Sequence, residues 1–221
     1  MRKYFCAGFL SILLAASVFA DGIVTAGSFF DTVSSYYASL RTYEARVDIK
    51  AGKQTMSGKV SFKRPDLLRI DFTSPSEQVI CFNGDRLTIY LPGSSAILNQ
   101  SVQSNSGANM ATSQGLSLMR RYYNVAYEKS SAPVPLSEDN PEQVIKLTLS
   151  RKNTAEAFRY IKLAINPESK LIRRIEGITP QGESFVFTFS SYAINVDIPD
   201  NRFLYDAPSS ANNYNNFLFN E

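Results

Sequence analysis

Between Gly58 and Leu98 the chain alternates apolar and polar residues in four short runs. The runs are separated by turn-forming residues around Pro65, around Pro75 and at Asn83-Gly84. This pattern predicts an antiparallel meander of consecutive hairpins. Because residues two apart share one face of a strand, the alternation gathers a continuous apolar face. Its members are Val60, Phe62, Leu68, Ile70, Phe72, Leu87, Ile89 and Leu91.

In one run of the meander, residues 79–82, every position is apolar, so both faces of the strand would be apolar. This favours a strand that is buried on both faces, so Ile80 and Phe82 are candidate members of the same apolar face. Cys81 lies between them, and its apolar neighbours predict a buried, unreactive thiol.

Apolar residues recur every three or four positions in two further segments, which predicts helices. The first spans about residues 28–41, with the stripe Phe29, Phe30, Val33, Tyr36, Tyr37 and Leu40. The ordinary interpretation of such a stripe is core packing. If the helix is a lid, the same stripe covers the apolar face of the sheet. Residues 108–123 favour a second lid helix carrying Leu116 and Met119, although a loop with one short packed helix is equally consistent.

Alternation continues through much of the remaining chain. Strands are predicted over residues 43–50, 125–129, 144–149, 158–165, 171–178 and 184–194, with an exposed loop over residues 130–141. The total of about ten or eleven strands suits one strongly curved antiparallel sheet that nearly closes into an incomplete barrel, with two or three helices on its concave face. The tail over residues 209–221 is expected either to fray or to dock on an edge.

The first twenty residues have the layout of a cleavable signal peptide: cationic Arg2-Lys3, an apolar run, and Val18-Phe19-Ala20 before Asp21. We therefore expect an exported protein. Residues 21–221 contain no linker that forces a split, and we expect them to form a single domain. Cys6 has no acylation motif before it, so no lipid anchor is expected. Of the 23 basic residues, 21 remain after cleavage against 20 acidic ones. This near neutrality gives no reason to expect a nucleic-acid partner.

The residues of common catalytic sites are missing. The chain contains no histidine, which excludes Ser-His-Asp and Cys-His catalysis and the commonest zinc ligand. It contains no glycine-rich phosphate loop either. We therefore expect a protein that is not an enzyme, with no catalytic residue, no metal site and no cofactor.

The meander resembles that of the periplasmic lipoprotein carriers, the LolA family. The resemblance rests on Phe62-Lys63-Arg64-Pro65, on the run from Arg69 to Phe72, on Pro75, and on Val79-Ile80 with Asn83-Gly84-Asp85 before Leu87. It implies a half-open barrel whose concave face holds the acyl chains of a lipoprotein under a helical lid. The cavity would be lined by Val60, Phe62, Leu68, Ile70, Phe72, Ile80, Phe82, Leu87, Ile89 and Leu91.

The resemblance also implies partners and a latch. A monomer would take acylated lipoproteins from an inner-membrane lipoprotein-releasing ABC transporter and pass them to an outer-membrane acceptor. The residue at the position of Arg64 would bond to the lid helices and keep the empty carrier shut, and Arg64→Leu would then bind cargo but release it poorly. Alternatively, Lys63 and Arg64 only solvate a strand end.

Other functions fit the same pattern. The LolB acceptor of the pathway has a similar fold, but it is itself acylated. A sensor of mislocalised lipoproteins and a structural envelope protein with a filled core are further alternatives. Uptake of an acyl chain separates the last of these from a carrier.

Overall fold

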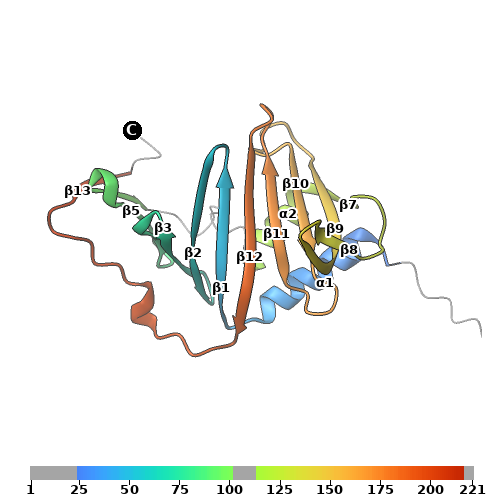
Figure 1. The fold of residues 1–221 in the computed structure, drawn as a ribbon, viewed down its shortest axis with the longest axis horizontal. Helices are drawn as coiled ribbons and strands as arrows, with labels where there is room; N and C mark the ends of the chain where they lie inside the picture. Colours follow the sequence, from blue (N-terminus) through green and yellow to red (C-terminus); the bar gives the residue numbers. More distant parts are fainter. Residues whose placement is uncertain (1–23, 102–112, 217–221) are drawn as a thin grey trace, which may run out of the picture.

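A computed structural model of the protein describes residues 24–101 and 113–216. Within these residues thirteen strands form one open, curved sheet in the order β13-β6-β5-β4-β3-β2-β1-β12-β11-β10-β9-β7, and β8 pairs with β9 (Figure 1). All neighbours are antiparallel except β13 and β6. The mainly β architecture with a half-open sheet confirms the predicted fold class.

The strands begin and end close to the predicted turns. Their bounds are β1 Thr42–Ala51, β2 Gln54–Lys63, β3 Leu67–Ser74, β4 Ser76–Phe82, β5 Arg86–Leu91, β6 Ala96–Ser101, β7 Tyr123–Tyr127, β8 Val134–Ser137, β9 Asn140–Arg151, β10 Tyr160–Ile165, β11 Ile172–Ile178, β12 Ser184–Ile194 and β13 Asn212–Asn215. Two short 3-10 turns, η1 Pro92–Ser94 and η2 Asp200–Phe203, interrupt the connections.

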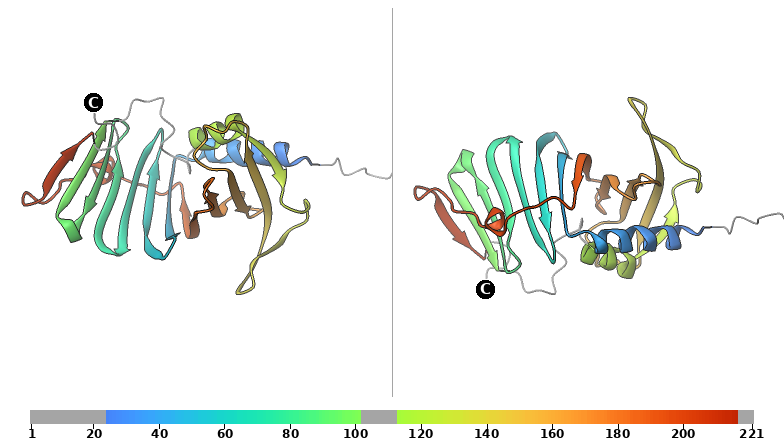
Figure 2. Two further views of the ribbon diagram at one scale, coloured as in Figure 1. Left: turned by 90° about the horizontal axis from the view of Figure 1, so that it is seen from above. Right: turned by 90° about the horizontal axis from the view of Figure 1, so that it is seen from below.

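Two helices lie against the half of the sheet that ends in β7 (Figure 2). They are α1, Ala26–Ser39, and α2, Ser113–Tyr122, which match the two predicted helical segments. Thr25 caps α1 by accepting a hydrogen bond from the Ser28 amide. Neither of these helices is long and apolar enough to span a bilayer.

The main apolar core lies between the helices and the inner face of the sheet, which is the face the helices cover. Phe30 and Val33 of α1 and Leu116 of α2 are fully buried there. They pack in one cluster with residues of β1, β2, β9, β10, β11 and β12, including Val47 and Leu149. The aromatic stripe of α1 thus faces the apolar side of the alternating strands, as the sequence predicts.

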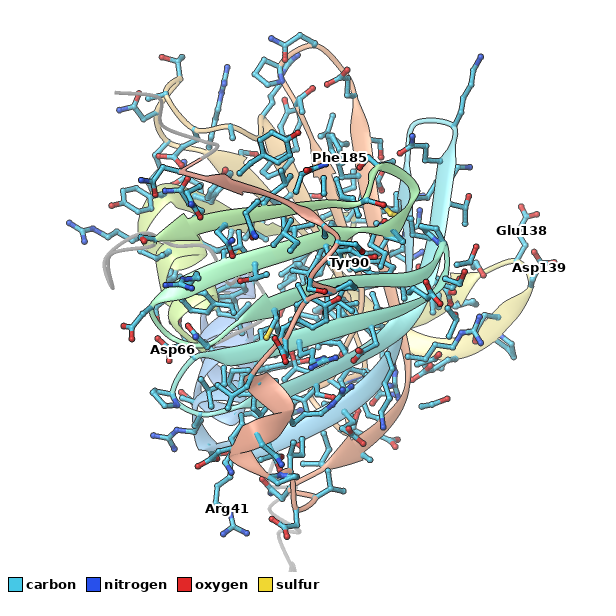
Figure 3. All side chains as sticks on the ribbon, turned by 90° about the vertical axis from the view of Figure 1, so that its left-hand side faces the viewer. Arg41, Asp66, Tyr90, Glu138, Asp139 and Phe185 are labelled. Atoms are coloured by element: carbon cyan, nitrogen blue, oxygen red, sulfur yellow. The ribbon has the colours of Figure 1, made fainter. Side chains whose placement is uncertain are left out.

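The outer face of β2 to β6 is covered by residues 196–216, which we call the C-terminal strap (Figure 3). The Lys63 ammonium donates to the Ile198 carbonyl oxygen at 2.7 Å, and the Arg69 guanidinium donates to the carbonyl oxygens of Arg202 and Leu204 at 3.1 Å. At its end the strap becomes β13. A small second core, made of Val79, Cys81, Tyr90, Ile97 and Ala211, lies beneath it.

Two segments differ from the sequence expectation and raise the strand count. The predicted loop over residues 130–141 contains β8, which folds back onto β9 as a projecting hairpin with Glu138 and Asp139 at its tip (Figure 3). The tail docks on the sheet edge through Asn212–Asn215, the alternative to fraying. The predicted signal peptide, residues 1–20, lies outside the described residues.

Candidate functional site

The ladder from β2 to β6 aligns aliphatic side chains in a row across the inner face. Val60 pairs with Ile70, Ile70 with Ile80, Ile80 with Ile89, and Ile89 with Leu98. Such cross-strand neighbours have Cβ atoms about 5 Å apart, so their side chains touch. Five strands therefore contribute to one continuous apolar surface.

A second row runs beside the first. Phe62 pairs with Leu68, Leu68 with Phe82, and Phe82 with Leu87. The register also settles the face of the strand that is apolar on both phases: Ile80 and Phe82 lie on the inner face, whereas Val79 and Cys81 lie beneath the strap. Eight of the ten predicted cavity residues thus lie in these two rows. Of the other two, Phe72 packs in the main core and Leu91 pairs with Ala96 at the end of β5.

Burial decreases along the first row away from the helices, whereas in the second row Phe82 of β4 is still buried, at 5% exposure. Val60 and Phe62 are 2% exposed, because they pack in the main core. Ile70, Ile80 and Ile89 are only partly buried. In Figure 2 the two helices do not reach over the strands that carry Ile80 and Ile89. The inner face is therefore filled at one end and presents part-exposed aliphatic groups at the other, a surface suited to apolar ligands.

Helix α1 presents the predicted stripe to this face. Phe29, Phe30, Val33, Tyr37 and Leu40 are buried, and Tyr36 is partly buried. From α2, Leu116 and Met119 are buried in the same cluster. The two helices are joined at their surfaces by an ion pair between Asp31 and Arg120, with the charged atoms 3.0 Å apart.

A tyrosine pair joins α1 to the sheet inside the core. The Ile172 amide donates a hydrogen bond to the Tyr37 hydroxyl oxygen at 2.9 Å, and the Tyr192 hydroxyl donates to the Ile172 carbonyl oxygen at 2.8 Å. The two hydroxyl oxygens lie 3.5 Å apart. Burial raises the pKa of Tyr37 to about 12 and raises the pKa of Tyr192 as well. Both phenols therefore stay protonated at neutral pH.

Tyr192 was not among the residues singled out by the sequence pattern. Counting two by two from Phe189 places Ser191 on the inner face and Tyr192 on the outer one. The pairing of β1 with β12 shifts register between Glu44 and Arg46, and Ser191 has a positive φ of 52°. This bulge turns Tyr192 inward, where it joins the main core.

Arg64 lies at the end of the sheet where β1 begins and β2 ends. Strand β2 ends at Lys63. Arg64 therefore lies outside the strand and does not continue the alternation that places Val60 and Phe62 on the inner face. The Arg64 amide donates to the Arg41 carbonyl oxygen at 2.9 Å, just beyond the end of α1, and its side chain is exposed. Together with Thr42, Lys63 and residues 195–198, both arginines line a pocket of about 440 Å³. Among the described residues we find no hydrogen bond from the Arg64 guanidinium to a helix, so its latch role stays a prediction.

The sequence profile described as "Outer membrane lipoprotein carrier protein LolA" matches residues 46–206. The chain belongs to the LolA family. The match begins within β1 and ends at residue 206, so it contains strands β2 to β12 and the first part of the strap, whereas α1 and β13 lie outside it.

An individual relative carries the same description, and solved structures share the fold. A Pseudomonas putida (strain GB-1) protein named outer-membrane lipoprotein carrier protein is 24% identical over 160 residues, covering 72% of this chain and 71% of its own. The structure of an uncharacterized conserved protein from Thermus thermophilus superposes with a TM-score of 0.56 at 12% identity, covering 85% of this chain and 96% of that one. Lipoprotein LppX from Mycobacterium tuberculosis gives a TM-score of 0.52 at 11% identity, covering 78% and 96%. At these identities the structural likeness shows a shared fold.

Proposed function

We propose that this protein is a periplasmic chaperone that binds the acyl chains of lipoproteins released from the inner membrane and carries them to the outer membrane. The proposal rests on the row of partly exposed aliphatic side chains from Ile70 to Ile89. This row lies on the face of the sheet whose other half is covered by the two helices. It is a binding function with no chemical step. The family supports the choice of lipoproteins as cargo.

The energetics explain why a carrier is needed. An acyl chain of about 15 methylenes gains about 12 kcal/mol on leaving water, at about 0.8 kcal/mol per methylene. Two or three such chains prevent a free lipoprotein from crossing an aqueous compartment alone. An inner face that covers the chains offsets this cost, and it needs no specific polar contact because acyl chains offer none.

The proposed partners follow from this route. An inner-membrane lipoprotein-releasing ABC transporter would load the carrier, and an outer-membrane acceptor would unload it. The protein would act as a monomer, since one inner face holds one cargo.

A direct test compares acylated cargo with the same protein lacking its lipid. Purified protein is mixed with a detergent-released lipoprotein, or with the variant of that lipoprotein whose acylated cysteine is replaced by serine. Native mass spectrometry should detect a complex only with the acylated form, and a fluorescent acyl probe should be displaced by it. Equal binding of both forms, or no uptake of the probe, would contradict the proposal.

A further inference from the structure

The first aliphatic row of the inner face continues past β6 onto β13, the edge strand far from the two helices (Figure 2). Strand β13 lies parallel to β6, and in this ladder Tyr214 pairs with Leu98. Because paired residues of neighbouring strands point to the same face of a sheet, Tyr214 lies on the inner face. The row therefore extends from Ile80 and Ile89 through Leu98 to Tyr214.

The Tyr214 side chain is available for a ligand. This residue is 53% exposed, and among the described residues we find no hydrogen bond or aromatic contact of its ring. A single exposed aromatic residue is ordinary on a protein surface. Tyr214 differs because it lies in line with the partly buried Ile80, Ile89 and Leu98. It thus enlarges an existing apolar surface instead of standing alone.

The second row does not reach the edge as an apolar surface. It passes from Phe82 through Leu87 to Gln100 of β6, so its last member before β13 is polar. Gln100 is 4% exposed, and its side-chain amide donates a hydrogen bond to the Ser101 carbonyl oxygen at 3.0 Å. Of the two rows, only the first stays apolar across β6. An apolar ligand that crosses the sheet to β13 therefore follows the first row.

The two ends of the first row differ in chemistry. At β2 the row ends in Val60, which is 2% exposed and packs in the main core. At β13 the neighbours of Tyr214 are exposed asparagines, including Asn212 on the same face and Asn215. A tyrosine suits the boundary between an apolar and a wet environment. An acyl ligand has the same polarity along its length, with its polar end matching β13 and its methyl end matching the interior of the row.

The length of the row fits a long acyl chain. From β3 there are three strand spacings to β6 and a fourth to β13; at about 4.8 Å each, these distances are about 14 Å and about 19 Å. An extended hydrocarbon chain advances about 1.25 Å per carbon, given bonds of about 1.5 Å and angles of about 111°. About 11 carbons therefore reach from β3 to β6, and about 15 carbons reach β13.

We propose that Tyr214 is a ligand-contact residue at the polar end of the acyl site. The acyl chain lies across the strands along the first row, with its methyl end toward Ile70 on β3 and its polar end at Tyr214 on β13. This assignment rests on the proposed function for its ligand. It adds a strand of the C-terminal strap to the binding surface, and that strand lies outside the residues that the family profile matches.

The orientation can be tested by fluorescence because the chain contains no tryptophan. Tyr214→Trp places a single indole on β13. The probes are two stearic acids, one with a doxyl quencher on the fifth carbon, near the carboxylate, and one with it on the sixteenth. The two labels lie about 14 Å apart along an extended chain, so the fifth-carbon probe should quench at least about twofold more strongly. Equal quenching, or stronger quenching by the sixteenth-carbon probe, would overturn the proposed orientation.

Asn213→Trp is the matched control for the face of the sheet. Asn213 is adjacent and exposed, but it pairs with Ile97, which packs in the second core beneath the strap. Its indole should be quenched by neither probe beyond the level that the probes produce with free tryptophan. If both reporter variants are quenched alike, the ligand does not lie on the inner face at β13, and the assignment of Tyr214 is wrong.

Affinity supplies the second arm. Tyr214→Ser should raise the dissociation constant of a fluorescent acyl probe about three- to tenfold, because it removes part of the apolar surface that the chain covers. The fold should tolerate this change, since the ring is exposed and the described residues give it no partner. Asn213→Ser, on the opposite face, should bind as wild type. Unchanged affinity in Tyr214→Ser would overturn the proposal.

The same measurements separate this assignment from the carrier function. If wild type takes up the probe but Tyr214→Trp stays unquenched and Tyr214→Ser binds normally, the carrier function stands and the role of Tyr214 fails. If wild type takes up no acyl probe, the carrier function fails and the assignment of Tyr214 falls with it.

Discussion

Cys81 and Phe203 join the sheet to the C-terminal strap: the Cys81 thiol donates a hydrogen bond to the Phe203 carbonyl oxygen, with 3.2 Å between sulfur and oxygen. Both residues are buried, at 3% and 1% exposure. The contact lies on the outer face, opposite the candidate site. The strap buries the apolar residues on the outer face of these strands. It therefore contributes to the folding of the same strands that carry the inner face.

Phe203→Ala should loosen the strap and expose Cys81. Truncating a buried phenylalanine costs about 3–5 kcal/mol, so the strap should detach more often, and labelling of Cys81 by a maleimide should accelerate at least about tenfold. Burial also raises the pKa of the Cys81 thiol, which keeps the wild-type reaction slow. Leu204→Ala is the control, because Leu204 is adjacent but 66% exposed. Equal rates in the two variants would show that the strap does not protect the thiol.

Asp71 is the charged centre of the strap contact. Its carboxylate accepts hydrogen bonds from Arg69 at 2.8 Å and from Arg202 of the strap. Asp71→Asn removes the charge between two guanidinium groups and should lower the free energy of unfolding by about 1–2 kcal/mol. Urea unfolding followed by circular dichroism measures this. Arg46→Gln, which breaks an exposed pair with Asp48, should leave the midpoint unchanged, and a similar loss in both variants would contradict a special role for Asp71.

The inner face and α1 could be predicted because each depends on local periodicity. Residues two apart from Val60 to Leu91 lie on one face in the structure, and the α1 stripe is buried as its spacing indicates. Residues 79–82 are apolar at every position, which indicated a strand buried on both faces; in the structure its outer face is buried beneath the strap. These patterns need no knowledge of distant partners.

The strap and the pair formed by Tyr37 and Tyr192 could not be predicted from the sequence. The strap has no regular alternation, and its β13 is asparagine-rich, a composition depleted in strands. It is held by Lys63, Arg69 and Asp71, more than a hundred residues away. Tyr192 depends on a bulge that reverses its face. Contacts of this kind arise from tertiary geometry, which periodicity does not encode.

Stability should fall in alkaline solution through Tyr37. Its folded pKa of about 12 lies above the ordinary tyrosine value of 10.0, so between these values the unfolded state releases a proton that the folded state keeps. The stabilisation is complete below pH 10 and is lost as pH rises toward 12. Tyr37→Phe has no hydroxyl to titrate. The amount by which its free energy of unfolding lies below that of the wild type should therefore shrink by about 2 kcal/mol across that window. Urea unfolding at several pH values across the window checks this, with a constant deficit as the contrary result.

Gly58 should not tolerate a side chain. A Cβ atom there would lie 2.6 Å from the Asp71 carbonyl oxygen and 3.1 Å from the Phe72 Cα, and backbone atoms cannot move aside as a side chain does. The β2–β3 ladder already shifts register between Ser57 and Gly58. Gly58→Ala should therefore cost about 1–3 kcal/mol in the free energy of unfolding. Gly93→Ala, where a Cβ meets nothing within 4 Å, should be neutral, and equal effects would argue against a steric cause.

Ile89 provides the most direct test of the apolar row. It lies between Ile80 and Leu98 and is only partly buried, so Ile89→Asn should be tolerated by the fold while placing an amide where acyl chains would lie. Full burial of an isoleucine side chain contributes about 1.5–3 kcal/mol, so the dissociation constant of an acyl probe should rise about tenfold. Thr88→Asn, on the opposite face of the same strand, should bind as wild type, because Thr88 contacts Asn99 rather than the inner face. Unchanged affinity in Ile89→Asn, with thermal melting confirming both folds, would place the ligand elsewhere.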